Sequence, residues 1–212
     1  AIREREYGLD HVAVAESLSN LALLYKLRGL YAKSEPLYAR SLAIYEKALG
    51  PDSPIVATVA INMAGLYRDQ GAYAKAEALL ERALAIREKA LGPNHPEVAG
   101  CLNNLAVVYR DQGAFAKAEP LYTRSLAIFE KALRPDHPHL AMSLNNLASL
   151  YQDQGSYAKA EPLFVRALAI NEKALGPDHR DVALSLNNLA ALYQVQGDFE
   201  RAEPLYVRSL AI

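Results

Sequence analysis

The fold is decided by residues 94–135, which read NHPEVAGCLNNLAVVYRDQGAFAKAEPLYTRSLAIFEKALRP. Close copies of this string begin at Asp10, Asp52, Asp136 and Asp178. The five starting residues are each 42 residues apart, with no insertion or deletion between them. Because self-similarity at a fixed spacing is the signature of repeat architectures, the sequence predicts a solenoid of stacked units.

The predicted plan is one domain over residues 1–212, with repeats at about 10–51, 52–93, 94–135, 136–177 and 178–212 and with 1–9 as the tail of a preceding repeat. The chain begins Ala1-Ile2 and ends Ala211-Ile212, which is the same phase of the repeat. Natural arrays usually end in a polar capping helix. We therefore expect a fragment of a longer protein, whose uncapped ends would allow end-to-end self-association.

Each repeat predicts two helices. The first begins at the Asp or Asn, whose side chain can cap free N–H groups. It ends at a glycine suited to the left-handed C-terminal conformation, namely Gly29, Gly71, Gly113, Gly155 or Gly197. In the first repeat the second helix runs from about Tyr31 to Leu49. Four copies carry a proline early in this helix (Pro36, Pro120, Pro162, Pro204), which predicts a late helix start or a mild kink, while Ala78 takes that position in the second repeat.

Apolar residues recur at helical spacing in both predicted helices, as in Val98, Leu102, Leu105 and Tyr109. A single hairpin cannot bury both apolar stripes, but stacked neighbours can. The fold class that follows is all-α: a right-handed superhelical solenoid of five helix-turn-helix units, with the first helices on the concave face.

Composition excludes several classes of function. Lys plus Arg is 23 and Asp plus Glu is 24, so the clustered positive charge that nucleic acid or an anionic membrane surface needs is missing. The apolar runs are too short to cross a bilayer. One cysteine, Cys101, allows no intrachain disulfide, which fits a reducing, cytoplasmic location.

The third repeat places large and small residues in a recognisable order: Leu102, Leu105, Ala106, Tyr109, Gly113, Phe115, Ala118, Tyr122 and Ser125. This order resembles the tetratricopeptide (TPR) signature, whose usual period is about 34 residues. The longer repeat, with its NNLA and AEPLY strings, resembles the repeats of kinesin light chains and of many bacterial relatives. The near-identity of the units looks most like a bacterial array.

The resemblance implies a protein-interaction scaffold that binds an extended peptide or a partner helix in its concave groove. The groove-facing positions would hold one asparagine in every repeat (Asn20, Asn62, Asn104, Asn146, Asn188) and a second in the last three (Asn103, Asn145, Asn187). An amide offers donors and an acceptor to a peptide backbone. The alternative is that these amides bond to the adjacent helix and fix the stacking, a role that should appear in all repeats.

Arg68 and Arg110 would add positive charge to the groove, together with Lys26, whereas Gln152 and Gln194 follow in the later repeats. Solvated helix ends are the alternative for these charges. Some family members clamp a C-terminal carboxylate with Lys or Arg early in the first helix. That clamp is missing here, because its positions read Glu16, Thr58, Gly100, Met142 and Leu184.

No catalytic, metal or cofactor site is predicted. The histidines that recur at helix starts are one repeat apart, too far to share a metal. Cys101 reads as a packed residue, and the recurring glutamates (Glu35, Glu77, Glu119, Glu161, Glu203) as a solvated face with modest ion pairing. The alternative to a free-standing scaffold is the sensor arm of a larger bacterial signalling enzyme, such as a switch NTPase or a caspase-like protease.

Overall fold

The computed structural model describes residues 2–212, and every regular element in that range is a helix. The chain divides into two compact units, an N-terminal unit (Ala1–Val108) and a C-terminal unit (Tyr109–Ile212). The boundary falls within helix α6 (Pro96–Asp111).

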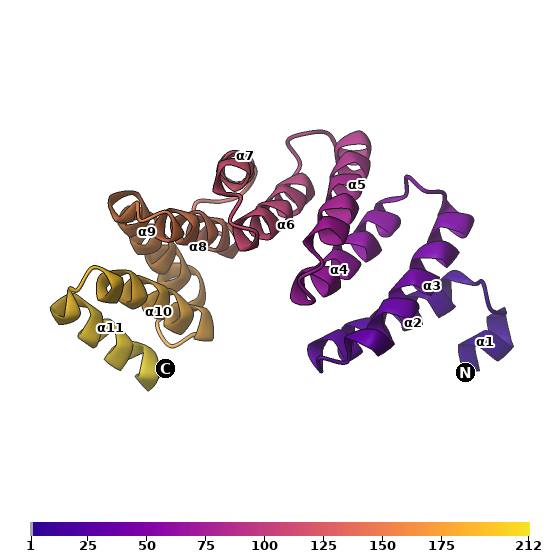
Figure 1. The fold of residues 1–212 in the computed structure, drawn as a ribbon, viewed down its shortest axis with the longest axis horizontal. Coiled ribbons are helices and arrows are strands. Elements are labelled where there is room, and N and C mark those ends of the chain that lie inside the picture. Colours follow the sequence, from indigo (N-terminus) through magenta and orange to yellow (C-terminus); the bar gives the residue numbers. More distant parts are fainter. Residues whose placement is uncertain (1) are drawn as a thin grey trace. The chain divides into compact units, whose positions relative to one another are not determined.

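The N-terminal unit contains two helical hairpins that precede α6. Its helices are α1 (Ile2–Tyr7), α2 (Val12–Leu27), α3 (Tyr31–Leu49), α4 (Pro54–Asp69) and α5 (Tyr73–Leu91). Figure 1 shows α2 against α3 and α4 against α5, and α3 also packs against α4. The middle helix, α4, therefore packs against both neighbouring helices, with Val56, Ala60 and Leu66 fully buried.

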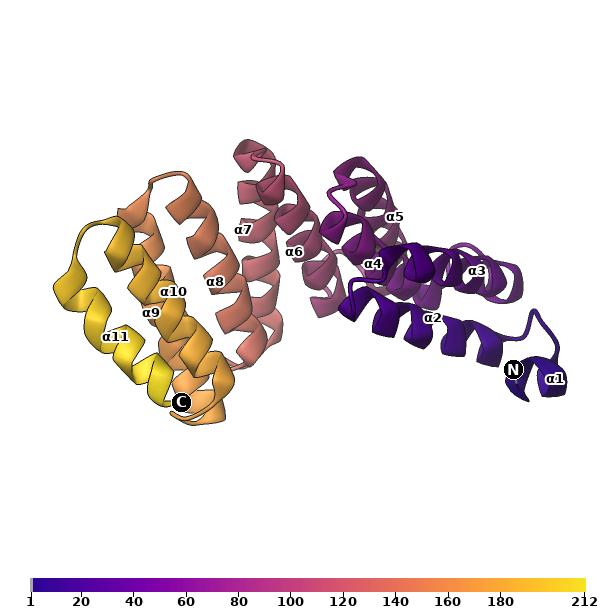
Figure 2. The ribbon, with the colours of Figure 1, turned by 60° about the horizontal axis from the view of Figure 1, so that its bottom comes forward.

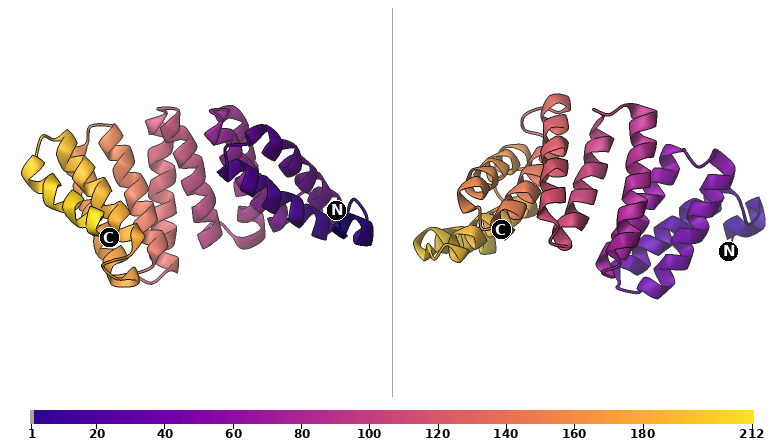
Figure 3. Two further views of the ribbon diagram at one scale, coloured as in Figure 1. Left: turned by 90° about the horizontal axis from the view of Figure 1, so that it is seen from below. Right: turned by 45° about the horizontal axis from the view of Figure 1, so that its top comes forward.

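The C-terminal unit repeats this arrangement. Its helices after α6 are α7 (Phe115–Ala132), α8 (Pro138–Asp153), α9 (Tyr157–Leu175), α10 (Arg180–Val195) and α11 (Phe199–Ala211). Figure 2 shows α8 to α11 side by side, and in both views of Figure 3 the last two helices (orange and yellow) stay together. The core of helices α8 to α11 contains Phe164, Leu189, Leu192 and Tyr193.

The predicted glycine ends of the first helices are confirmed. Gly29 has φ 70°. Its N–H donates to the Lys26 carbonyl at 2.9 Å, and the Leu30 N–H donates to the Tyr25 carbonyl at 2.8 Å. These two bonds form a Schellman motif, which needs a left-handed residue at this point. The matching glycines of the other repeats have φ between 71° and 78°.

The predicted Asp and Asn caps are wrong by one residue. The N-cap of α2 is His11, whose Nδ1 accepts from the Ala13 N–H at 3.2 Å, and its backbone is extended (φ −82°, ψ 144°). His95, His137 and His179 accept in the same way at later helix starts, and Ser53 does so at α4. The acidic residue before the cap instead meets the second helix of the same repeat: Lys47 Nζ, on α3, lies 2.6 Å from Asp10 Oδ2. The recurring histidines are thus helix caps.

The late helix start expected at the prolines is also wrong. Helix α3 begins at Tyr31 and carries Pro36 as an interior residue. Helix α5 begins at the equivalent Tyr73 although it has Ala78 in place of the proline. The start is therefore set by the turn that precedes the helix.

The glutamate series links neighbouring repeats. Tyr67 Oη donates to Glu35 Oε1 at 2.8 Å, and the Lys75 ammonium lies 4.7 Å from the centre of the Tyr67 ring. Burial, and then the bond to Glu35, raises the pKa of Tyr67 to about 12. The C-terminal unit repeats the contact in Tyr151–Glu119 and Tyr193–Glu161, at 3.0 and 2.9 Å. The expected modest ion pairing is present in Lys75–Glu35 and Arg201–Glu161, and the expectation of a solvated face is corrected because these carboxylates also accept from a tyrosine of the next repeat.

Candidate functional site

The first helices place most of the predicted asparagines at hollows of the surface. Asn62 and Asn104 line a pocket in the N-terminal unit. Asn145, Asn146 and Asn188 line another in the C-terminal unit. The other three do not share one environment: Asn20 and Asn187 are exposed, whereas Asn103 is buried.

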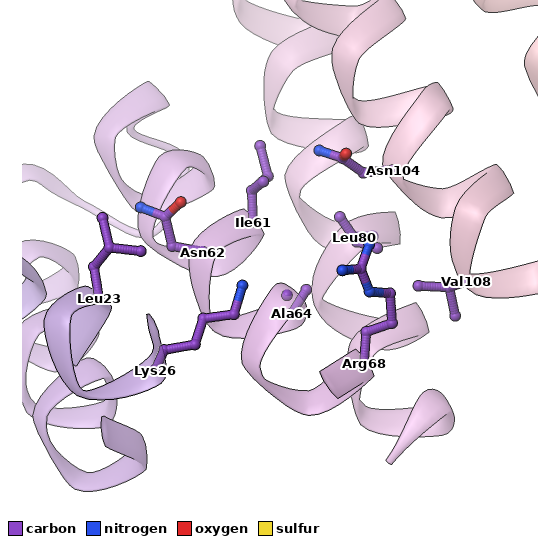
Figure 4. Close-up of a pocket in the computed structure, with 10 residues that line it drawn as sticks. Leu23, Lys26, Ile61, Asn62, Ala64, Arg68, Leu80, Asn104 and Val108 are labelled. Atoms are coloured by element: carbon purple, nitrogen blue, oxygen red, sulfur yellow. The ribbon is translucent and has the colours of Figure 1, made fainter. Parts of the chain in front are cut away.

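The pocket of Asn62 and Asn104, here called the Lys26 pocket, has a volume of about 200 Å³. In Figure 4 the two amides come from α4 and α6, and the Lys26 ammonium extends toward α4 beside Ala64. Lys26 Nζ lies 3.3 Å from Asp69 Oδ2. Gly65 makes this path possible, because a Cβ there would lie 2.9 Å from Lys26 Nζ.

Arg68 and Arg110, the predicted groove cations, are both engaged by aspartates. Arg68 Nη2 lies 3.0 Å from Asp69 Oδ1. Arg110 Nε lies 2.6 Å from Asp153 Oδ2, on the first helix of the next repeat. Arg110 and Asp153 are only 28% and 37% exposed, so the pair holds the guanidinium in place. Arg68 also lines the Lys26 pocket, where its guanidinium rises between Leu80 and Val108 (Figure 4).

A second hollow of the N-terminal unit, the Arg87 pocket, lies where α4, α5 and α6 meet and has a volume of about 490 Å³. Helix α5 places Arg87 in it. Arg87 Nη1 forms an ion pair with Glu97, and Nη2 donates to Thr58 Oγ1 at 2.6 Å. The Arg87 side chain is only 12% exposed. An internal guanidinium therefore occupies this junction between repeats.

The pocket of Asn145, Asn146 and Asn188, here called the Asn171 pocket, has a volume of about 340 Å³ and lies where α8, α9 and α10 meet. Asn171 is 5% exposed and donates from Nδ2 to Ser185 Oγ at 2.9 Å. Ser185 in turn donates to the Asp181 carbonyl at 3.0 Å. Apolar side chains of Met142 and Leu184 form the exposed rim.

This hydrogen-bond chain also fixes Asn145. Its Nδ2 points at Ser185 Oγ, 3.4 Å away, because the Ser185 hydroxyl hydrogen is already used by the Asp181 carbonyl. Asn145 Oδ1 is buried and has no hydrogen-bond partner within the described part of the chain. Asn145 therefore contributes to stacking on α10, in the role that the alternative interpretation assigned to the series.

The Arg87 and Asn171 pockets are the same junction, two repeats apart. Thr58, Arg87, Glu97, Gly100 and Cys101 of the first correspond to Met142, Asn171, Asp181, Leu184 and Ser185 of the second. The sequence interpretation missed this site because it searched only the first helices. A signal was present: the second-helix position of Arg87 reads Tyr45, Arg87, Phe129 and Asn171, in repeats that otherwise hardly differ.

Other reactive groups offer no chemistry. Burial raises the pKa of the Cys101 thiol to about 11, so it stays protonated and unreactive at neutral pH. Among the side chains that the structure describes, which exclude those of residues 1, 2 and 4, no three His, Cys, Asp or Glu come together in a way that could hold a metal ion. In the same range no helix has the length and apolarity needed to cross a membrane.

Comparison with known proteins places this geometry in context. A family profile described as the tetratricopeptide repeat matches residues 1–47, 13–89, 55–131, 102–164 and 139–212. No match was found among curated proteins. Among solved structures, a Podosopora anserina protein described as a kinesin light chain with nearly identical TPR-like repeats is 30% identical; 95% of each chain is covered, and the TM-score is 0.77. BtubC (BKLC) from P. vanneervenii is 29% identical over 94% of this chain and 80% of its own, with a TM-score of 0.79.

Proposed function

Because the chain belongs to the tetratricopeptide repeat family, whose fold generally serves as a non-catalytic scaffold for protein–protein interaction, we propose that it binds an extended segment of a partner protein along its first helices. The observation that supports this most directly is the repetition of one amide position at surface pockets of both units. Asn62 and Asn104 line the Lys26 pocket, and Asn146 and Asn188 line the Asn171 pocket.

An asparagine row suits a ligand recognised through its backbone. Each side-chain amide can donate to a peptide carbonyl and accept from a peptide N–H, whatever side chains the peptide carries. Such bonds position a segment, whereas the pockets beside them select its side chains. The neighbouring position is not uniform, since Asn103 is buried and Asn187 is exposed, and its Asn145 donates to Ser185 of the next repeat.

Affinity measurements on variants test the proposal. Random extended peptides displayed on phage would be selected on the whole chain, and the affinity of selected peptides would be measured by fluorescence anisotropy. We expect Asn104→Ala with Asn146→Ala to weaken binding about thirtyfold, because each removes bonds to the peptide backbone worth about 1 kcal/mol and the two losses add to about 2 kcal/mol. The thermal unfolding midpoint should hardly change.

Arg134→Ala provides the control, since that side chain is 84% exposed and lines none of the three pockets described above. It should leave affinity and stability as they are. Unchanged peptide binding together with a large loss of stability in the asparagine variant would contradict the proposal and assign the row to repeat stacking.

A further inference from the structure

The two equivalent pockets differ in one charge. In the Arg87 pocket the Glu97 carboxylate is neutralised by the guanidinium of Arg87. In the Asn171 pocket the acidic residue is retained as Asp181, but the arginine is replaced by Asn171. The chain thus shows the junction once with a guanidinium beside its carboxylate and once without that group.

Asn171 does not replace Arg87 as a partner of the carboxylate. Its amide reaches the main-chain carbonyl of Asp181 at 3.4 Å and the Ser185 hydroxyl at 2.9 Å. Two side-chain nitrogens lie near the Asp181 carboxylate oxygens, His179 Nδ1, which accepts from the Asp181 N–H, and Arg180 Nε; both are 3.8 Å away and so beyond hydrogen-bond distance. Arg180 is 91% exposed, so water screens its charge.

The helix dipole does not account for the difference. Asp181 lies in the first turn of α10 and Glu97 in the first turn of α6, where a carboxylate favours the helix N-terminus. Both carboxylates are stabilised by their helix N-terminus, yet only in the N-terminal unit does a guanidinium also lie beside the carboxylate. The missing cation is therefore a property of the pocket itself.

The rest of the lining suits a long basic side chain. None of the described residues that line the Asn171 pocket is a lysine or an arginine. Met142 and Leu184, which are 43% and 57% exposed, offer apolar surface for an aliphatic stem. Burial, and then the neighbouring His137, lowers the pKa of His139, so that ring adds no opposing charge at neutral pH.

We propose that the Asn171 pocket binds an arginine side chain of the partner segment, with its guanidinium beside Asp181 as the Arg87 guanidinium lies beside Glu97. The stem lies along Met142 and Leu184, and the Asn146 and Asn188 amides are placed for the adjoining backbone. A guanidinium fits better than an ammonium because its planar fork can bind a carboxylate through two parallel bonds. This inference rests on the proposed function and specifies which side chain the partner presents.

The test uses capped tripeptides and the whole ¹⁵N-labelled chain. Ac-Ala-Arg-Ala-NH₂ would be titrated while the side-chain amide signals of Asn145, Asn171 and Asn188 are followed by NMR. The citrulline peptide, which has the same shape without the charge, and the lysine peptide are the ligand controls. We expect the arginine peptide to shift these signals, with the lysine peptide weaker and the citrulline peptide without effect.

Two variants remove the site by different routes. Asn171→Arg places the chain's own guanidinium in the pocket and should abolish the shifts. Asp181→Asn keeps the shape and should weaken binding about tenfold, since a charge-assisted bond is lost. Glu97→Gln, in the equivalent pocket of the N-terminal unit, should leave the affinity unchanged.

A gain of function completes the design. Arg87→Asn empties the Arg87 pocket beside Glu97 and should create a second arginine site, seen as new shifts at Thr58 and Glu97. Circular dichroism would establish that each variant is folded. Equal binding of the citrulline peptide, binding that survives Asn171→Arg, or shifts that map away from the pocket would overturn the inference.

The inference and the proposed function fail in different ways. Peptides selected on the whole chain could depend on Asn104 and Asn146 while lacking arginine, which would overturn only the arginine assignment. Arginine binding in the pocket, combined with selected peptides that are insensitive to both asparagines, would overturn only the backbone-binding proposal.

Discussion

The Arg87 pocket and the Asn171 pocket differ at the residue that the second helix places between two first helices. In the N-terminal unit this residue is a charged side chain that lines the junction and contacts Glu97 and Thr58. In the C-terminal unit it is the short amide of Asn171. This amide hydrogen-bonds to Ser185 and makes no bond to the Asp181 carboxylate, which lines the pocket. Near-identical repeats thus share one backbone fold, while a single second-helix position decides whether a guanidinium or an amide lines the junction.

The largest expected effect concerns the reactivity of Cys101 in the wall of the Arg87 pocket. Cys101 forms part of its wall and is 1% exposed, and its thiol pKa of about 11 leaves little thiolate near neutral pH. Iodoacetamide should therefore alkylate Cys101 about a hundredfold more slowly than an ordinary thiol, with a rate that rises about tenfold per pH unit. Mass spectrometry over a pH series measures this rate. A rate equal to that of the denatured chain would show that the pocket is open.

The next largest effect is the change in the free energy of unfolding when the internal guanidinium is removed. Arg87→Ala should lower the free energy of unfolding by about 2 kcal/mol, because a largely buried side chain loses its packing and Thr58 loses its hydrogen bond. Asn171→Ala, the matched change, should cost about 1 kcal/mol. Urea unfolding followed by circular dichroism compares the two. Equal losses would mean that the two junctions are equally filled.

A backbone effect of about 1 kcal/mol is expected at Gly65 in the Lys26 pocket. Gly65→Ala should stabilise the chain by about this amount, since alanine favours the helix interior and the close contact is only with the flexible end of Lys26. Ala191→Gly, at the equivalent position of α10, should destabilise it similarly. Thermal melts of both variants check the opposite signs. Destabilisation by Gly65→Ala would indicate that Lys26 cannot move.

The smallest effect is a coupling energy. A double-mutant cycle of Arg87→Ala and Glu97→Ala should give about 0.5 kcal/mol, because Glu97 is 49% exposed and water screens the pair. The cycle of Asn171→Ala and Asp181→Ala should give almost none, since Asn171 bonds to the Asp181 main chain. Repeating both cycles at high salt would remove the first coupling only. A salt-sensitive coupling between Asn171 and Asp181 would contradict the comparison.

Much of the fold could be predicted from the sequence because the signals are local and repeated. The all-α TPR solenoid and its resemblance to kinesin light chains are confirmed. The second helix of the first repeat spans Tyr31–Leu49 as predicted, and the glycine ends follow from the φ that only glycine adopts readily.

The errors share a physical cause, which is competition between partners that are distant in sequence. Asp10 could cap α2, but the Lys47 ammonium lies within reach and the next residue, His11, supplies the cap. Glu35 lacks a suitable partner nearby in sequence and finds the Tyr67 hydroxyl 32 residues later. The Asn171 pocket forms only when α8, α9 and α10 are packed together.

The bond between Glu35 and Tyr67 has a consequence for how such a chain can change length. The same bond joins a glutamate to the tyrosine 32 residues later in Glu119–Tyr151 and Glu161–Tyr193 of the C-terminal unit. Duplicating or deleting one whole 42-residue period in the gene would therefore rejoin compatible partners wherever the break falls. Recombination could lengthen or shorten the array while every internal junction keeps its acceptor and donor.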